Sequence, residues 1–339
     1  MAFAALGLSN VGQRAAIARG YVTPTPVQAA AIPAVLRGQD VWACAQTGSG
    51  KTAAFALPLV ERCVVDDTDA ALKVLILVPT RELAAQIGAA CVAYAQFAPR
   101  RLKIVTAVGG ASINPQMMAL RGGADIVVAT PGRLLDLVAH NAVQLGRVST
   151  LVLDEADRLF DLGFADELAR ILALLPARRQ NLLFSATFPA EVHALADALL
   201  ADPVRVDVPA GAATTPRIEQ RAILVDKARR TQLLRQLIAV HAWSRVLVFA
   251  GTRYTTEHVA EKLRRLGLTA AALHGELTQA ARTQALADFK AKRLRVLLAT
   301  DLAARGIDIV QLPAVVNFDL PRSTDDYLHR IGRTGRAGE

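Results

Sequence analysis

The sequence has few aromatic residues, few cysteines and no excess of negative charge. Phe, Trp and Tyr make up 5% of the 339 residues, whereas 53% are hydrophobic, so the interior must be built from aliphatic side chains. The three cysteines (Cys44, Cys63 and Cys91) contain no CxxC pair. This count and spacing favour neither a disulfide framework nor a zinc site, and they are typical of a reducing compartment.

The sequence also lacks a run suited to a bilayer. Residues 83–99 and 104–120 carry no charge, but both contain Gly and Pro and fall short of the about 20 apolar residues that a membrane helix needs. The first residues are apolar without a basic region or a clear cleavage site. We therefore expect no signal peptide, no membrane association and a cytoplasmic location.

The net charge of +9 is unevenly distributed. Residues 1–208 hold 18 basic and 18 acidic side chains, and residues 209–339 hold the other 21 basic and 12 acidic ones. An excess confined to the second half indicates contact with a polyanion there. Arginine-rich composition is an equally good explanation of the charge by itself, since 32 of the 39 basic residues are Arg.

Residues 45–52 (AQTGSGKT) have the pattern of a phosphate-binding loop. They follow an apolar run at 41–44 and lead into residues that can form a helix. Glycines let several N–H groups point at one anion, and the helix N-terminus adds its positive dipole end. Lys51 can reach the β- and γ-phosphates, and the Thr52 hydroxyl can complete a Mg²⁺ shell. The pattern usually begins with Gly, whereas this loop begins with Ala45.

Strand-like and helix-like segments alternate along the chain. Residues 73–78 (KVLILV) are typical of a strand covered on both faces, and a helical stretch follows from 81 to about 98. Repeated βα units predict a parallel sheet whose ligands lie at the carboxyl ends of its strands. Residues 209–216 (PAGAATTP) interrupt the pattern, which resumes with an expected strand at 217–225. We predict two α/β domains, 1–208 and 217–339, joined by a linker at 209–216.

An acidic cluster follows one of the expected strands. Residues 151–153 (LVL) lead directly into Asp154, Glu155 and Asp157. A hydrolase of Mg·ATP needs one carboxylate to hold the metal and another to orient the attacking water. Taken alone, the cluster is also compatible with a solvated acidic turn, but the upstream Lys51 and Thr52 favour the catalytic interpretation.

The motifs in this chain closely resemble those of one family. Residues 154–157 read DEAD, the sequence that names the DEAD-box RNA helicases of superfamily two, and the loop at 45–52 matches that family's Walker A motif, Ala45 included. In the first half, the family's other motifs are matched by 20–28 (GYVTPTPVQ, with Phe3 upstream), 79–83 (PTREL), 109–110 (GG), 130–133 (TPGR) and 185–187 (SAT). In the second half they are matched by 248–252 (VFAGT), 279–282 (QAAR), 299–308 (ATDLAARGID) and 329–336 (HRIGRTGR).

The resemblance runs from Phe3 to Arg336 in the family's order, and it implies a fold of two tandem RecA-like α/β domains. In the family the second domain continues beyond the last motif. We therefore expect the C-terminal domain, which ends at Glu339, to be truncated.

The resemblance also implies an ATP site with Mg²⁺. Tyr21 would stack on adenine and Gln28 would read its edge, which a side-chain amide can do bidentately. Without the preceding Pro-Thr-Pro turn at 24–26, a surface helix glutamine would be the favoured interpretation of Gln28. Thr52 and Asp154 would hold the metal, and Glu155 would position or deprotonate water. The implied catalytic residues are Lys51, Asp154, Glu155, Arg333 and Arg336, and the implied ATP-binding residues are Tyr21, Thr23, Gln28, Thr47, Gly48, Ser49, Gly50, Lys51, Thr52, Gly306 and Asp308.

Arg333 and Arg336 match the family's arginine fingers, which neutralise the γ-phosphate across the interdomain cleft. Three positions apart, they would project from one face of a helical turn, which is also how an ordinary basic helix face looks. The neighbouring His329 and Gly332 fit the family's motif and favour the finger interpretation. Residues implied to couple the ATP site to RNA are Asp157, Ser185, Thr187, His329 and Arg330.

The resemblance implies RNA as the polyanion, bound through its backbone without sequence preference. Glycines permit close approach, while Arg and Thr supply donors to phosphate oxygens. The implied RNA-binding residues are Thr80, Arg81, Gly109, Gly110, Thr130, Pro131, Gly132, Arg133, Thr252, Gln279, Arg282, Thr300 and Asp301.

Three functions remain open at this point. The chain is expected to be an RNA-stimulated ATPase that closes two domains on RNA and locally unwinds short duplexes. An ATP-gated RNA clamp that nucleates ribonucleoprotein assembly, with RNA-degradation or ribosome-assembly partners, is the alternative. A DNA translocase is the third.

Overall fold

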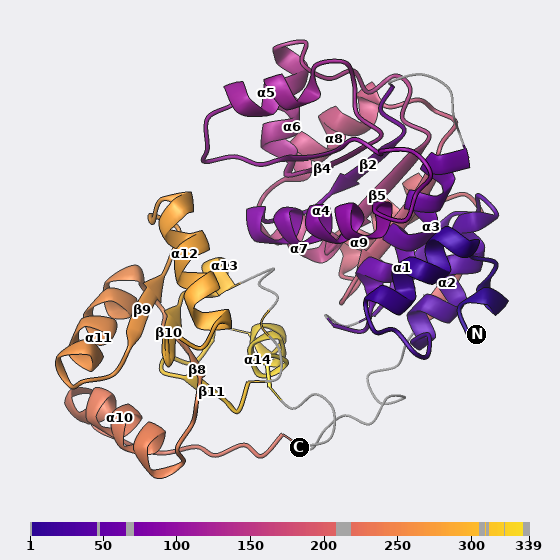
Figure 1. Cartoon of the computed structure of the whole chain (residues 1–339). Helices are drawn as coiled ribbons and strands as arrows, with labels where there is room; N and C mark the ends of the chain where they lie inside the picture. The colour runs from indigo at the N-terminus through magenta and orange to yellow at the C-terminus, as the bar shows by residue number, and fades with distance from the viewer. Residues whose placement is uncertain are drawn as a thin grey trace. The chain divides into compact units, whose positions relative to one another are not determined.

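The computed structural model describes residues 2–45, 48–65, 71–207, 218–304, 309, 312–321 and 323–334. The chain divides into two compact units, residues 1–212 and 213–339, each with its own parallel sheet flanked by helices (Figure 1). The predicted α/β fold of two parallel-sheet domains is confirmed. The predicted linker at 209–216 lies outside the described residues.

The first unit contains a seven-stranded sheet with strand order β3-β4-β2-β5-β6-β1-β7, in which each pair of neighbouring strands is parallel. Its strands are β1 (Val41–Cys44), β2 (Val74–Leu77), β3 (Ile104–Ala107), β4 (Ile126–Ala129), β5 (Thr150–Asp154), β6 (Gln180–Ser185) and β7 (Val204–Asp207). The edge strand β7 and the short helix α7 (Ala156–Asp161) were not expected from the sequence.

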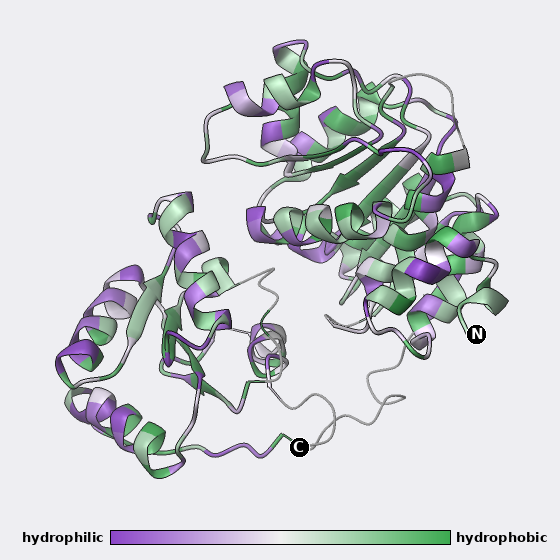
Figure 2. Ribbon diagram, viewed as in Figure 1, coloured by the Kyte–Doolittle hydropathy of each residue, from purple (hydrophilic) through white to green (hydrophobic). Residues whose placement is uncertain are grey.

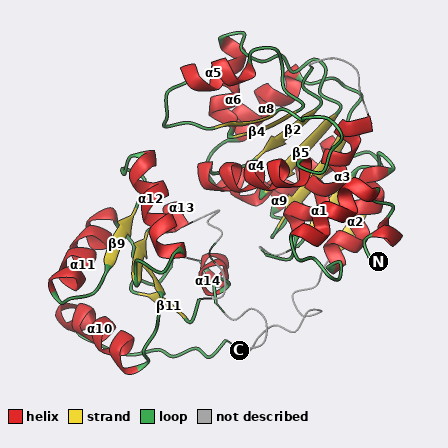
Figure 3. Ribbon diagram, in the orientation of Figure 1, coloured by secondary structure: helices red, strands yellow, loops and turns green. Residues whose placement is uncertain are grey.

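Both faces of this sheet are covered by helices (Figure 3). The alternation within β2 explains this, because Val74 and Ile76 belong to one buried cluster and Leu75 and Leu77 to the other. One face packs on α1 (Asn10–Ala18), α2 (Pro26–Leu36), α3 (Lys51–Val65) and α4 (Arg81–Ala95). The other face packs on α5 (Asn114–Leu120), α6 (Pro131–Ala139), α7, α8 (Ala165–Leu174) and α9 (Ala190–Leu199). A short 3₁₀ helix, η1, spans Ala4–Leu6.

The second unit has a four-stranded parallel sheet with the order β11-β8-β10-β9. Its strands are β8 (Val246–Phe249), β9 (Ala270–Leu273), β10 (Val296–Ala299) and β11 (Ala314–Asn317). Its helices are η2 (Lys227–Arg229), α10 (Arg230–Val240), α11 (Arg253–Arg265), α12 (Gln279–Lys290), α13 (Asp301–Ala304) and α14 (Thr324–Ile331). Figure 2 shows hydrophobic strands at the centre of each unit and helices with mixed faces around them.

The strand expected at 217–225 is not present in the part of that segment that the structure describes. Residues 218–226 form neither helix, strand nor turn, and the side chain of Leu224 is fully exposed. A strand needs a neighbour for its backbone N–H and C=O groups, and neither edge strand of this sheet, β11 or β9, pairs with the segment. Local sequence pattern cannot supply that neighbour.

Helix starts follow local chemistry. Thr80 caps α4 by accepting a hydrogen bond from the Leu83 N–H (3.3 Å), and Thr252 caps α11 through the Thr255 N–H (3.1 Å). Pro26 and Pro131 stand in the first turns of α2 and α6, where no N–H is required. Within the described ranges, no helix is long and apolar enough to cross a membrane.

Candidate active site

Apart from the motif at 20–28, which precedes β1, the predicted motifs of the first unit follow the carboxyl ends of its strands. Because the strands are parallel and in register, these ends form one edge of the sheet. The strand order then groups the motifs: those at 109–110, 130–133 and 80–81 follow the neighbouring strands β3, β4 and β2, and those at 154–157, 185–187 and 45–52 follow β5, β6 and β1. Expected RNA contacts therefore occupy one half of the edge and expected nucleotide contacts the other.

The described part of the phosphate loop suits an anion. Gly48 and Gly50 have left-handed backbones (φ 76° and 95°), which glycine adopts without strain. Lys51 is 5% exposed at the start of α3, and its Nζ has no hydrogen-bond partner among the described residues. A buried ammonium without acceptors is costly, so this position fits a bound triphosphate. Thr47, also predicted here, lies outside the described residues.

Asp154, at the end of β5, is a buried carboxyl close enough to Lys51 to interact with it electrostatically. Burial raises the pKa of Asp154 to about 6, the nearby Lys51 ammonium opposes the rise, and the Glu155 carboxylate adds to it. Its Oδ1 accepts from the Glu155 N–H (3.0 Å). A buried carboxylate of this kind is a suitable oxygen ligand for a divalent cation. Thr52, which is half-buried on α3, has a hydroxyl that could be a second ligand.

Replacing Asp154 by asparagine is expected to stabilise the first unit while removing the carboxylate that is predicted to hold Mg²⁺. The pKa of Asp154 is about 6 in the folded chain against 3.8 for a free aspartate, so the ionised carboxylate costs about 3 kcal/mol of folding free energy at neutral pH. That cost is complete above pH ~6 and vanishes below pH ~4. Urea denaturation of both proteins at pH 7.5 and pH 4 checks this, and an equal gain at both pH values would contradict it.

Glu155 has a strained backbone. Its φ and ψ of 53° and 53° lie in the left-handed region, which costs a residue with a side chain roughly 1 kcal/mol. This conformation turns the chain from β5 directly into α7, and the Glu155 side chain is 8% exposed. Strain of this kind persists where the surrounding structure holds it, commonly at active sites.

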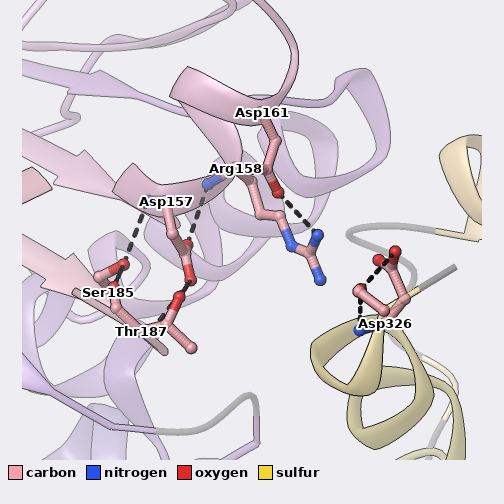
Figure 4. Close-up of polar contacts among 7 residues, drawn as sticks. Asp157, Arg158, Asp161, Ser185, Thr187 and Asp326 are labelled. Atoms are coloured by element: carbon pink, nitrogen blue, oxygen red, sulfur yellow. Dashed lines mark hydrogen bonds and ion pairs between the residues drawn. The ribbon is translucent and has the colours of Figure 1, made fainter. Parts of the chain in front are cut away.

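Asp157 joins the end of β5 to the end of β6 (Figure 4). Its Oδ2 accepts from the N–H (3.0 Å) and the hydroxyl (2.8 Å) of Thr187, and its own N–H donates to the Ser185 hydroxyl (3.1 Å). The Ser185 hydroxyl in turn donates to the Thr187 carbonyl (2.7 Å). The structure thus brings these three predicted coupling residues of the first unit into one network, in which Asp157 and Ser185 are buried and Thr187 is half-buried.

Gln28 links α2 to the phosphate loop. Its Nε2 donates to the Gly50 carbonyl (3.2 Å) and its Oε1 accepts from the Thr25 N–H (3.0 Å). At 3% exposure it is no surface helix residue, so that alternative is wrong. A Cβ at Gly50 would stand 2.4 Å from Gln28 Nε2, which explains the glycine. Tyr21 is half-buried, its hydroxyl 3.2 Å from that of Tyr94 and its ring centroid 6.3 Å from that of Phe3, whereas Thr23 is exposed.

The predicted RNA contacts of the first unit converge on Arg81. An added Cβ at Gly110 would lie 1.7 Å from Arg81 Nη1, so the guanidinium rests directly against this left-handed glycine (φ 71°), and Gly109 is nearby. Arg133 donates to the Ala111 carbonyl (2.9 Å), and its Nη1 is buried without a hydrogen-bond partner among the described residues. Thr80, Thr130 and Pro131 are buried in the adjoining helix starts, and Gly132 is half-buried.

Arg330 is the centre of the polar network in the second unit. Its Nε and Nη2 donate to the two oxygens of Asp301 (2.6 and 2.7 Å), and its Nη1 donates to Asn317 Oδ1 (2.8 Å) and the Asp319 carbonyl (2.7 Å). The guanidinium also lies over the Phe249 ring, 4.9 Å from its centroid. One buried side chain therefore ties together the ends of β8, β10 and β11. Both oxygens of Asp301 accept hydrogen bonds from Arg330. The predicted contact between Asp301 and RNA therefore stays a prediction.

The other predicted residues of the second unit are more dispersed. Arg282 is buried and donates to the His274 carbonyl (3.2 Å), Thr300 follows β10, Thr252 is exposed at the start of α11, and Gln279 begins α12. Arg333 is 8% exposed. Gly306, Asp308 and Arg336 lie outside the described residues, as does the side chain of His329.

Comparison with known proteins identifies the family. The DEAD/DEAH box helicase model matches residues 25–195, and the helicase conserved C-terminal domain model matches residues 229–338. The DEAD-box ATP-dependent RNA helicase CshA of Geobacillus kaustophilus is 40% identical over 337 residues, covering 99% of this chain and 71% of that protein. This chain belongs to the DEAD-box family of ATP-dependent RNA helicases.

Two other proteins, one compared by sequence and one by structure, support the same family assignment. The ATP-dependent RNA helicase DeaD of Mycobacterium tuberculosis is 43% identical over 316 residues, which cover 93% of this chain and 55% of that protein. The structure of S. cerevisiae Dbp5 bound to RNA and ADP BeF3 aligns with a TM-score of 0.85 and 31% identity, covering 100% of this chain and 87% of that one. The resemblance found in the sequence is thereby confirmed.

One positioning residue in this DEAD-box chain has no recognisable sequence signal. Gln116 on α5 accepts from the Val108 N–H (3.0 Å) and donates to the Val108 carbonyl (3.0 Å) and the Ser112 carbonyl (3.3 Å). It holds the loop containing Gly109 and Gly110 as a neighbouring strand would. A single glutamine six positions after Gly110 forms no recognisable motif, so only the structure reveals this role.

Replacing Gly110 by alanine is expected to weaken RNA binding roughly tenfold, equivalent to about 1.4 kcal/mol, because the new methyl displaces the Arg81 guanidinium. The salt dependence of RNA affinity should fall by about one phosphate contact. Fluorescence anisotropy with a uridine oligonucleotide measures both. Gly38→Ala is the matched control, since Gly38 has a similar φ (76°) and no atom within 4 Å of its added Cβ. Equal losses in both variants would assign the effect to backbone strain.

Proposed function

We propose that this DEAD-box RNA helicase binds Mg·ATP and RNA at the carboxyl edge of its first sheet, and that its two units close on RNA when ATP binds. Closure would locally separate short duplexes, and hydrolysis would release the RNA. The observation that carries the proposal is the division of that edge: the Arg81–Gly110 contact lies on the β3-β4-β2 half, and the Lys51–Asp154 pair on the β5-β6-β1 half.

Each group on the nucleotide half has a role that its chemistry suits. Lys51 neutralises phosphate charge, Thr52 and Asp154 hold Mg²⁺, and Glu155 orients or deprotonates the attacking water. Mg·ATP itself supplies the transferred phosphoryl group and the metal's charge neutralisation. Tyr21 and Gln28 contact the adenine, Asp308 contacts the ribose, and Arg333 and Arg336 provide charge from the second unit.

The Asp157 network lies within the nucleotide half of the edge, where it joins the end of β5 to the end of β6, and it supports the transmission of a change at the ATP site to the next strand end. Asp157 follows the metal-binding Asp154 by three positions and is fastened to Thr187, so a shift at one strand end is transmitted to the other. In the second unit Arg330 has the corresponding role. It donates hydrogen bonds to Asp301, which follows Thr300, and it contacts the ends of β8 and β11. These two networks support a switch that ATP and RNA bias together.

The decisive experiment compares nucleic acids on the whole chain. RNA, but not DNA of the same sequence, is expected to stimulate ATP hydrolysis, and ATP is expected to drive displacement of one strand from a short RNA duplex. ATP-dependent RNA binding without displacement would instead favour the RNA clamp. Equal stimulation by DNA would favour the translocase, and absence of stimulation by either would overturn the proposal.

A further inference from the structure

A pocket of about 740 Å³ lies on the first unit away from the proposed ATP and RNA residues. Its walls come from α5 and from the segments that precede three neighbouring strands, namely 71–72 before β2, 122–124 before β4 and 142–147 before β5. Because these strands are parallel, the pocket lies at the amino edge of the sheet, opposite the catalytic edge. Figure 1 shows α5 and α6, whose C-cap His140 also lines the pocket, close together.

The interior of this pocket is apolar and adaptable. Leu72, Leu120 and Val143 are buried and belong to the core cluster on this face, while Met117 and Met118 lie beside one another on α5. The chain has three methionines, so two of them line one pocket, and Met118 is 63% exposed. Methionine side chains adapt to varied apolar partners and are over-used at binding surfaces.

The polar lining has charge of one sign. Arg121 and Arg147 are exposed there, and none of the described residues that line the pocket is Asp or Glu. This bias is local, because residues 1–208 hold equal numbers of basic and acidic side chains. An apolar pocket of this size with a cationic rim is complementary to an anionic ligand that carries apolar side chains.

We propose that this pocket binds an acidic protein segment whose apolar side chains enter between α5 and the 142–147 segment. Arg121 and Arg147 pair with its carboxylates, and Met117 and Met118 contact its apolar anchors. RNA is the poorer fit, because the described lining contains no Phe, Tyr or Trp on which a base could stack. The pocket's place on the opposite edge lets a partner bind while the helicase engages ATP and RNA.

Methionine-methyl NMR on the whole chain tests the proposal directly. Labelling with [ε-¹³C]methionine gives three signals, assigned through Met117→Leu and Met118→Leu. The probe is a set of synthetic peptides that alternate pairs of glutamate with a single leucine, isoleucine or phenylalanine, and the control set has lysine for glutamate. At least one acidic peptide should shift the Met117 and Met118 signals saturably and leave Met1 unchanged, with affinity falling as salt rises.

Charge reversal separates a specific pocket from a general attraction. The double variant Arg121→Glu/Arg147→Glu should bind the acidic peptide at least tenfold more weakly and keep its RNA-stimulated ATPase rate, and Met118→Glu should also lose affinity. Arg178→Glu is the matched control, because Arg178 is exposed before β6 on the same edge but does not line the pocket. It should bind the peptide as the unmodified chain does.

Three results would overturn the proposal. The first is that no acidic peptide shifts the two methyl signals. The second is that the double variant binds as tightly as the Arg178→Glu control. The third is that a uridine oligonucleotide shifts the same signals and loses affinity in the double variant, which would assign the pocket to RNA.

Discussion

Replacing Glu155 by glutamine is expected to lower RNA-stimulated ATP turnover by at least about a hundredfold, because an amide cannot accept the proton of the attacking water. Mg·ATP should still bind, since Asp154 and Lys51 are unchanged. The left-handed backbone at Glu155 does not depend on the carboxylate, and glutamine has the same shape. Steady-state ATPase rates and equilibrium binding of ATP measure the two effects separately.

The same variant tests closure. If ATP and RNA both favour one closed state, each raises the affinity of the other by the same factor. A coupling of about 1–3 kcal/mol corresponds to roughly 5–150-fold tighter RNA binding with ATP than without nucleotide. RNA affinity of Glu155→Gln is measured with ATP, with ADP and without nucleotide, and three equal values would rule out the closure mechanism.

Glu61→Gln is the matched control for this substitution. Glu61 is also a buried glutamate of the first unit (9% exposed), but its carboxylate accepts from the Ser9 N–H at the start of α1. Glu61→Gln and Glu155→Gln make the same change of charge and shape, but Glu61 lies outside the proposed ATP site. Turnover in Glu61→Gln should stay within about twofold of the unmodified chain, whereas a loss equal to that of Glu155→Gln would indicate a general effect of burying an amide.

Replacing Lys51 by alanine is expected to reduce ATP hydrolysis by more than tenfold, because the phosphate-neutralising charge is removed from a buried position. The variant should also have a different pKa at Asp154. Without the ammonium that opposes the shift, the pKa of Asp154 rises further above its usual range. The remaining carboxylate is then less available to hold Mg²⁺ at neutral pH, so residual activity should increase with pH more steeply than in the unmodified chain.

The pH dependence distinguishes this role from simple loss of stability. Lys103→Ala is the control, since Lys103 lies before β3 at the amino edge and its Nζ donates to the Arg121 carbonyl (2.5 Å). ATPase rates from pH 6 to 9 for both variants, with thermal unfolding midpoints, complete the test. RNA-stimulated turnover retained in Lys51→Ala would remove this lysine from the site.

The chemistry of each short segment and the two-domain α/β class can both be predicted from local patterns in the sequence. A phosphate loop, a DEAD cluster and a strand such as 74–77 are each encoded in a few contiguous residues, through glycine conformations, side-chain chemistry and hydrophobic runs. For the same reason α4 begins at Arg81, where the sequence predicted it, because its cap Thr80 acts within one turn.

Which segments become neighbours depends on how the whole chain packs. The order β3-β4-β2-β5-β6-β1-β7 brings the nucleotide contacts after β1 beside those after β5 and β6, although all three expected RNA segments of this unit lie between them in the chain. Pairings such as Asp157 with Thr187 and Arg330 with Asp301 join residues about thirty positions apart. The segment 218–226 remains unpaired despite its strand-like sequence. In each case the deciding energy comes from packing and hydrogen bonding between distant parts of the chain, which no local pattern contains.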